Sequence, residues 1–194
     1  ACFAQAILPL LDDAEDKAVE EGQAAVNRYP DRFKAAYQDA FSAKIGLKDT
    51  PESLALAEDL LARMADNKAD FTLTFRNLSA LPGSSGPGAQ EKVRALFEDP
   101  TAFDSWAPEW HDACEREGQD PHSRRAAMEA VNPAYIPRNH RVEEAISASV
   151  QGDFKPFETL MDVLSAPFEE QPEHAAFMLP PKQEERVYET FCGT

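Results

Sequence analysis

The sequence contains little glycine, little cysteine and no long uncharged apolar run. Only 8 of the 194 residues are glycine, whereas alanine, leucine and glutamate are common and favour helices, because they lose little conformational freedom on entering one. No stretch approaches the ~18 uncharged apolar residues that a membrane span requires, and no signal peptide is visible. The three cysteines, Cys2, Cys114 and Cys192, are too few and too widely spaced for a disulfide framework or a zinc site. We therefore expect a soluble helical protein of a reducing compartment, the cytoplasm.

Basic residues are also scarce. The chain has 19 lysines and arginines against 35 aspartates and glutamates, a net charge of −16. Such a field repels nucleic-acid phosphates and anionic lipid head groups, which argues against nucleic-acid or membrane-surface partners. The length fits one domain over residues 1–194, with two small domains as the alternative. A chain of this length can bury roughly 70% of its unfolded surface, so it needs no metal ion or disulfide to fold.

The motifs of catalysis and of cofactor binding are missing as well. The loop at 81–88 contains three glycines, but it fits neither the dinucleotide-binding nor the Walker pattern, and its two prolines lack the N–H groups that would bind phosphate. His111 and Cys114 could offer two metal ligands, but zinc needs three or four and no second pair has matching spacing. No nucleophile–base–acid order or carboxylate pair stands out. The residues themselves therefore predict no catalytic, cofactor-binding or metal-binding site.

Apolar residues recur at helical spacing along almost the whole chain, which predicts an all-α fold. The capping residues Thr50, Asp70 and Asp120 predict three helix starts, and the spacing of Phe103, Trp106 and Trp110 is typical of a buried helix face. Four prolines within 166–194 exclude a long helix there and predict an extended or wrapped tail. We expect helices over 1–11, 13–27, 30–46, 51–64, 70–78, 89–98, 101–118, 121–130, 138–151 and 153–164.

Four arginines make residues 121–141 locally basic: Arg124, Arg125, Arg138 and Arg141, opposed only by Glu129. One interpretation is a docking point for an anion or an acidic partner element. The other is that these arginines cap helix ends and pair with carboxylates of the same chain. The acidic residues near the C-terminus, including Glu169 and Glu170, are expected to form a solvated face.

Cys192 is third from the C-terminal end of the sequence. An exposed thiol on a flexible arm can reach another cysteine, whereas a buried thiol is inert. The N-terminal residues begin inside an apolar helical pattern with no capping residue before them. We therefore expect the chain to begin inside a longer protein, with a processed native start as the alternative.

Several segments resemble the selenoprotein O (SelO) family. The segment Asn-Pro-Ala-Tyr-Ile-Pro-Arg-Asn-His at 132–140 is similar to the family's Asn-Pro-x-Tyr-x-x-Arg-Asn signature, and Pro-Phe-Glu-Glu-Gln-Pro at 167–172 resembles its Pro-Tyr/Phe-x-x-Gln-Pro segment. Residues 1–10, 43–47 and 74–78 also fit. The resemblance extends over essentially the whole chain.

The resemblance implies a function that composition does not. Members of the family are pseudokinase-fold enzymes that transfer AMP from ATP to Ser, Thr or Tyr hydroxyls of other proteins with Mg²⁺, and their nucleotide- and metal-binding residues lie upstream of the helix where this chain begins. The chain then corresponds to the helical end of the kinase-like C-lobe plus a C-terminal extension. It would be non-catalytic, with the rest of the parent chain and the parent's protein substrates as partners.

The resemblance also implies a role for Cys192, because the family carries Cys or selenocysteine at this position. Cys192 would be a redox thiol able to form a disulfide with a cysteine elsewhere in the parent. The alternative to the whole assignment is a standalone helical interaction module that docks through the four arginines.

Overall fold

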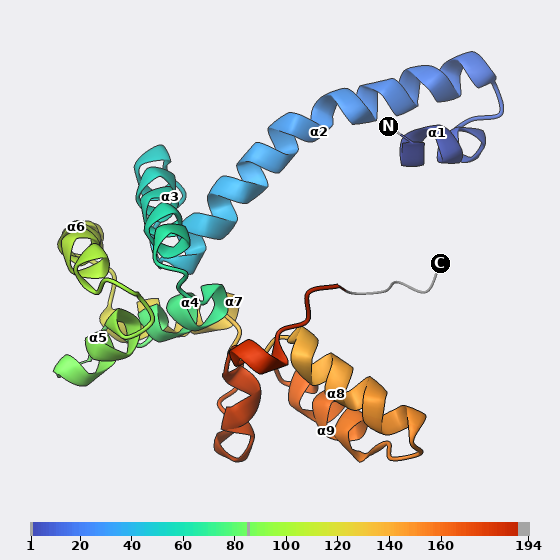
Figure 1. Cartoon of the computed structure of the whole chain (residues 1–194). Coiled ribbons are helices and arrows are strands. Elements are labelled where there is room, and N and C mark those ends of the chain that lie inside the picture. Colours follow the sequence, from blue (N-terminus) through green and yellow to red (C-terminus); the bar gives the residue numbers. More distant parts are fainter. Residues whose placement is uncertain (1, 85, 190–194) are drawn as a thin grey trace.

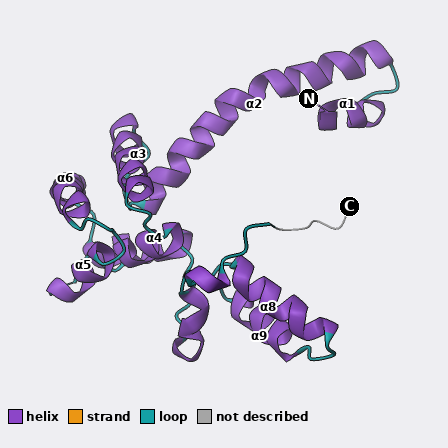
Figure 2. Cartoon of the chain, in the orientation of Figure 1, coloured by secondary structure: helices purple, strands orange, loops and turns teal. Residues whose placement is uncertain are grey.

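The computed structural model describes residues 2–84 and 86–189, and within these ranges it contains helices and loops but no strand (Figure 2). The predicted all-α class is confirmed. No helix in the described ranges is long and apolar enough to cross a membrane. The α-helices are α1 Cys2–Ile7, α2 Glu15–Lys44, α3 Pro51–Asp66, α4 Phe71–Ser79, α5 Pro87–Arg94, α6 Thr101–Glu117, α7 Pro121–Val131, α8 Asn139–Val150 and α9 Lys155–Ser165.

The main core lies where α3 to α7 meet the C-terminal end of α2 (Figure 1). Trp106 and Trp110 of α6 are each only 1% exposed, and their rings stack with centroids 5.9 Å apart. Their indole N–H groups donate to the carbonyls of Leu56 and Ile45, at 2.9 and 2.8 Å. The two tryptophans therefore join α6 to α3 and to the end of α2.

Three predicted helix starts are confirmed by their caps. The side chains of Thr50, Asp70 and Asp120 each accept a hydrogen bond from the backbone N–H three residues later. Each cap satisfies a donor that the first turn of a helix leaves free. These contacts are local, so spacing along the chain was enough to find them.

The predicted helix start at Pro30 is wrong. Residues 13–27 and 30–46 were expected as two helices, but α2 is one helix of 30 residues with Pro30 inside it. A proline within a helix removes one hydrogen bond, in this case to the carbonyl of Val26, four residues earlier. Both residues are exposed, so water can solvate that carbonyl and the helix continues.

The C-terminal part forms a second, smaller packing unit. The hairpin of α8 and α9 is followed by a segment that returns to residues 134 and 135, where Ala134, Tyr135 and Val163 are buried together. The tail was expected to be extended or wrapped. It wraps, but it contains two short 3₁₀ helices, Pro172–Met178 and Gln183–Glu185, and the first packs Phe177 and Met178 on this cluster. The predicted loop at 81–88 ends earlier than expected, because Pro87 begins α5.

Gly46 ends the turn after α2 in a conformation that other residues avoid. Its φ is +70°, and a Cβ added to it would lie 2.5 Å from Sδ of the buried Met128. We expect Gly46→Ala to lower the free energy of unfolding by about 2–3 kcal/mol, because it adds overlap in a packed core to the cost of the left-handed backbone. Urea unfolding followed by circular dichroism measures this change.

Gly118 provides the matched control. Its φ is +63°, but nothing lies within 4 Å of an added Cβ. Gly118→Ala should therefore show only the backbone cost, about 1–2 kcal/mol. Equal losses for the two variants would contradict the close packing of Gly46 against Met128.

Candidate functional site

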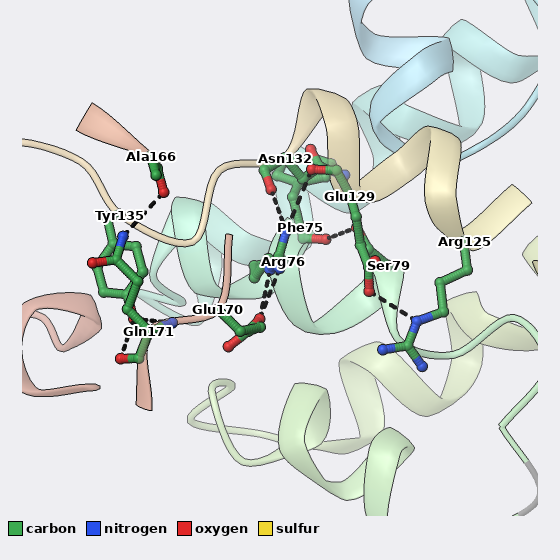
Figure 3. A network of polar contacts seen from close by, with 10 residues as sticks. All are labelled: Phe75, Arg76, Ser79, Arg125, Glu129, Asn132, Tyr135, Ala166, Glu170 and Gln171. Atoms are coloured by element: carbon green, nitrogen blue, oxygen red, sulfur yellow. Dashed lines mark hydrogen bonds and ion pairs between the residues drawn. The ribbon is translucent and has the colours of Figure 1, made fainter. Parts of the chain in front are cut away.

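The two most specific sequence motifs, at 132–140 and 167–172, lie against each other, and we call this region the motif junction (Figure 3). The backbone N–H groups of Ala134 and Tyr135 both donate to the carbonyl of Pro167, at 2.8 and 3.1 Å. The Tyr135 hydroxyl donates to the carbonyl of Gln171 at 2.8 Å and accepts from its N–H at 3.1 Å. Two segments about 35 residues apart along the chain are thus joined by four hydrogen bonds.

The side chain of Gln171 extends the junction to the end of α9. Its amide nitrogen donates to the carbonyls of Val163 and Ala166, both at 3.0 Å. The last carbonyls of a helix lack donors within the helix. Gln171 therefore caps α9 and holds the tail beside it.

Asn132 links the junction to α2 and α4. It is 1% exposed, and its amide nitrogen donates to the carbonyl of Lys44 at 2.8 Å and to the Ser79 hydroxyl at 3.0 Å. Its amide oxygen accepts from the Lys44 amine at 3.2 Å. The amine also lies over the rings of Phe71 and Phe75, at 5.6 and 5.5 Å, and burial lowers its pKa.

Arg76 is the buried cation of the junction. It is 6% exposed, and two of its nitrogens donate to one carboxylate oxygen of Glu170 at 2.7 and 3.0 Å. A third nitrogen donates to the carbonyls of Glu129 and Asn132, at 3.3 and 3.1 Å. Figure 3 shows Arg76 at the meeting point of these groups. Its charge and donors are satisfied by Glu129 of α7, by Asn132 directly after α7 and by Glu170 of the tail.

A second buried pair joins the other end of the 132–140 motif to α4. Arg138 is 7% exposed and donates to both carboxylate oxygens of Asp70, at 2.8 and 2.9 Å. Burial raises the pKa of Asp70, but the hydrogen bonds from Arg138 and from the N–H of Leu73 outweigh it, so the pKa lies below its usual value. Asp70 therefore acts both as helix cap and as the counter-ion of Arg138.

The chemistry of the junction is that of a structural clamp. Its amide, hydroxyl and guanidinium groups donate to carbonyls and carboxylates of the same chain, which makes a connected buried network. In the described ranges no three His, Cys, Asp or Glu side chains lie close enough to hold a metal ion. The arrangement can fix the relative positions of α4, α7, α8 and α9.

The four arginines of residues 121–141 do not form a common face. Arg124, 2% exposed, donates to the carbonyls of Gly46 and Cys114, while Arg138 pairs with Asp70. Arg125 is exposed and Arg141 is half-buried, and they pair with Glu129 and Glu144, both at 2.8 Å. All four arginines pair with carboxylates of the same chain: Arg124 with Glu117, Arg125 with Glu129, Arg138 with Asp70 and Arg141 with Glu144. Arg124 and Arg138 are almost fully buried, and docking through the four arginines stays a prediction.

Two cysteines, Cys114 and Cys192, were considered as functional residues, and only Cys114 lies within the described residues. Burial raises the pKa of the Cys114 thiol to about 11, so the thiol stays protonated at neutral pH and is a poor nucleophile or metal ligand. Cys192, the predicted redox residue, lies outside the described residues, and its role stays a prediction.

Sequence reasoning missed the partners of Arg76 and Arg138. Glu170 was expected on a solvated face, and its side chain is indeed 64% exposed, yet it is the counter-ion of Arg76. Asp70 was expected only as a cap. The only sign in the sequence that these two residues matter was their position, Glu170 within the 167–172 motif and Arg138 within the 132–140 motif.

Comparison with known proteins places the chain in a family. The family model described as "Protein adenylyltransferase SelO" matches residues 2–165. Proteins called "Protein nucleotidyltransferase YdiU" are similar over nearly the whole chain. That of Methylorubrum extorquens is 51% identical and covers 99% of this chain and 40% of the relative; that of Rhodopseudomonas palustris is 51% identical, with 99% and 39% covered. The relative from Nitrobacter winogradskyi is 46% identical, with 100% and 38% covered.

Two facts follow from these matches. The chain spans about two fifths of the length of the curated relatives that it matches. With the family model matching most of its residues, the chain belongs to the SelO protein adenylyltransferase family.

Proposed function

We propose that this chain is the non-catalytic, C-terminal helical part of a SelO-type enzyme that transfers AMP from ATP to hydroxyl groups of Ser, Thr or Tyr in target proteins. The observation that carries the proposal is the family match over residues 2–165 in a chain that spans only two fifths of its relatives. In this proposal, the segment corresponding to the other three fifths supplies kinase-like lobes that bind ATP and Mg²⁺. The enzyme acts in the cytoplasm.

The role proposed for the chain itself is to buttress the catalytic lobe. The support is the motif junction, where Arg76 and Asn132 donate to backbone carbonyls and Arg138 pairs with the Asp70 carboxylate. Pairing of most buried donors of these three side chains limits the cost of burying them, and Nε of Arg138 is the exception, with no partner among the described residues. The described residues offer no set of side chains that fits a metal ion, so we derive no step of AMP transfer from them.

Transfer of label from ATP tests the assignment. We expect full-length protein, incubated with Mg²⁺ and ATP labelled on its α-phosphate, to label protein substrates, and residues 1–194 alone to label none. ATP labelled only on the γ-phosphate is the control, because AMP transfer leaves that phosphate in pyrophosphate. Labelling by residues 1–194 alone would contradict the proposal that AMP transfer takes place in the segment that this chain does not match. A gene that starts immediately before Ala1 would favour the standalone interaction module instead.

Cys192 is proposed as a redox thiol that tethers the tail to the catalytic part through a disulfide. We expect AMP transfer by full-length protein to differ between oxidised and reduced samples, and the Cys192→Ser variant to lose this difference because it cannot form the disulfide. Cys114→Ser is the matched control, since the raised pKa of that thiol makes it a poor partner for exchange. If the Cys192→Ser variant kept the full response to oxidant, the tether would be excluded.

A further inference from the structure

The middle of α2, residues 25–36, is a stretch of helix that the rest of the described chain leaves exposed, although Ala25 and Arg28 at its start line a hollow together with residues of α1. We call it the arm. All twelve of its residues are exposed. The N-terminal end of α2 contacts α1 and the 3₁₀ turn Leu8–Leu10. The C-terminal end of α2 packs on α3 and α7. Figure 1 shows the helix running away from the main core between these two contacts.

The arm is not polar on all sides. Val26, Tyr29 and Phe33, at helical spacing, are 38%, 64% and 55% exposed. The ring of Phe33 stacks between those of Tyr29 and Tyr37, with centroids 5.9 and 6.0 Å apart. The stripe then continues through Phe41, whose ring centroid is 4.5 Å from that of Tyr37 and which packs against the main core. One apolar stripe thus begins in the core and ends exposed.

The arm cannot owe its helix to local preference alone. Pro30 lies inside it, and an interior proline costs a helix about 3 kcal/mol relative to alanine. Most helical stability in proteins comes from packing of an apolar face rather than from propensity. The described chain packs little against residues 25–36, so an outside surface that covers the exposed stripe would stabilise the helix there.

We propose that the exposed stripe of the arm docks on the part of a SelO-type protein that this chain does not match. This proposal rests on the proposed function. About three fifths of the length of each relative lies outside the matched stretch, which is ample to supply an interdomain interface of about 600–1,500 Å². A second copy paired arm to arm is a poorer occupant, because a symmetric pairing brings Arg28, Arg32 and Lys34 of one arm close to the same cations of the other.

The charges beside the stripe define the chemistry of the docked surface. The arm carries Arg28, Arg32 and Lys34 against the single carboxylate of Asp31, and none of the three cations makes an ion pair with another residue in the described part of the chain. The arm is therefore a basic segment in an acidic chain. The surface that receives it has an apolar centre for Tyr29 and Phe33 and carboxylates at its rim, as interfaces place charge at their edges.

Hydrogen exchange of the backbone amides in residues 25–36 tests the docking. We expect these amides to exchange on the order of 100-fold more slowly in full-length protein than in residues 1–194 alone, because docking closes the arm against local opening. In full-length protein, the Tyr29→Gln and Phe33→Gln double variant should restore fast exchange while keeping good helix formers. The Ile146→Gln and Val150→Gln double variant removes two exposed apolar side chains, also four residues apart, from α8, and should leave exchange in the arm unchanged.

Measuring AMP transfer on the same samples distinguishes a failure of the docking from a failure of the proposed function. Full-length protein that transfers AMP but exchanges the arm as fast as residues 1–194 overturns the docking and leaves the function standing. Slow exchange without AMP transfer supports the docking and counts against the function. Slow exchange in residues 1–194 that appears with dimer formation assigns the stripe to a second copy and also overturns the docking proposed here.

Discussion

Replacing Arg138 with methionine is expected to lower the free energy of unfolding by about 3–5 kcal/mol, the usual effect of removing one partner of a buried ion pair. Arg138 is 7% exposed and binds both carboxylate oxygens of Asp70, whose side chain is 18% exposed. Methionine keeps most of the apolar stem but leaves the Asp70 carboxylate without its counter-ion. Urea unfolding followed by circular dichroism measures the loss.

Two further variants isolate the charge. Arg125→Met removes a surface arginine from an ion pair with Glu129 on the same helix and should cost less than about 1 kcal/mol. Combining Arg138→Met with Asp70→Ser removes both charges and keeps a capping oxygen, so much of the stability should return. If Arg138→Met unfolded at the same urea concentration as Arg125→Met, the pair would not be the support that the structure indicates.

The same pair fixes the expected dependence on pH. The pKa of Asp70 is lower in the folded chain than its unfolded value of about 3.9. Its contribution to stability is therefore complete above the unfolded value and is lost as the pH falls through the lower, folded value. The destabilisation caused by Arg138→Met should accordingly shrink as the pH is lowered below about 4.

Trp110→Ala is the second change with a large expected effect, a loss of about 3–5 kcal/mol. The indole is 1% exposed, stacks on Trp106 and donates to the carbonyl of Ile45, the residue that follows α2. Alanine would leave a cavity between α6 and the end of α2 and remove the donor of a buried carbonyl. Thermal and urea unfolding of the purified variant provide the measurement.

Two comparisons show which part of the indole matters. Trp110→Phe keeps an aromatic ring but not the N–H, so its loss should be smaller and close to the cost of an unpaired buried carbonyl, about 1–3 kcal/mol. Tyr188→Ala removes an aromatic side chain that is 81% exposed and should change stability by less than about 0.5 kcal/mol. Similar losses for Trp110→Ala and Tyr188→Ala would show that the main core does not depend on α6 as described.

The continuity of α2 through Pro30 could not be predicted from the sequence. Its apolar pattern predicted helix on both sides of Pro30, and both parts are helical. The prediction of a break failed because the cost of a proline depends on whether the carbonyl that loses its donor can reach water. That depends on what packs around the helix, which spacing along the chain does not contain.

The sequence by itself determined the all-α class, most helix positions and the capped starts at Thr50, Asp70 and Asp120, since caps and periodicity act within a few residues. It also marked the 132–140 and 167–172 segments through their resemblance to one family. Only the tertiary structure decided that Arg76 meets Glu170, 94 residues away, and that Arg138 meets Asp70, 68 residues away. With 35 acidic residues available, local spacing cannot select a partner, because an ion pair is chosen by how the helices pack.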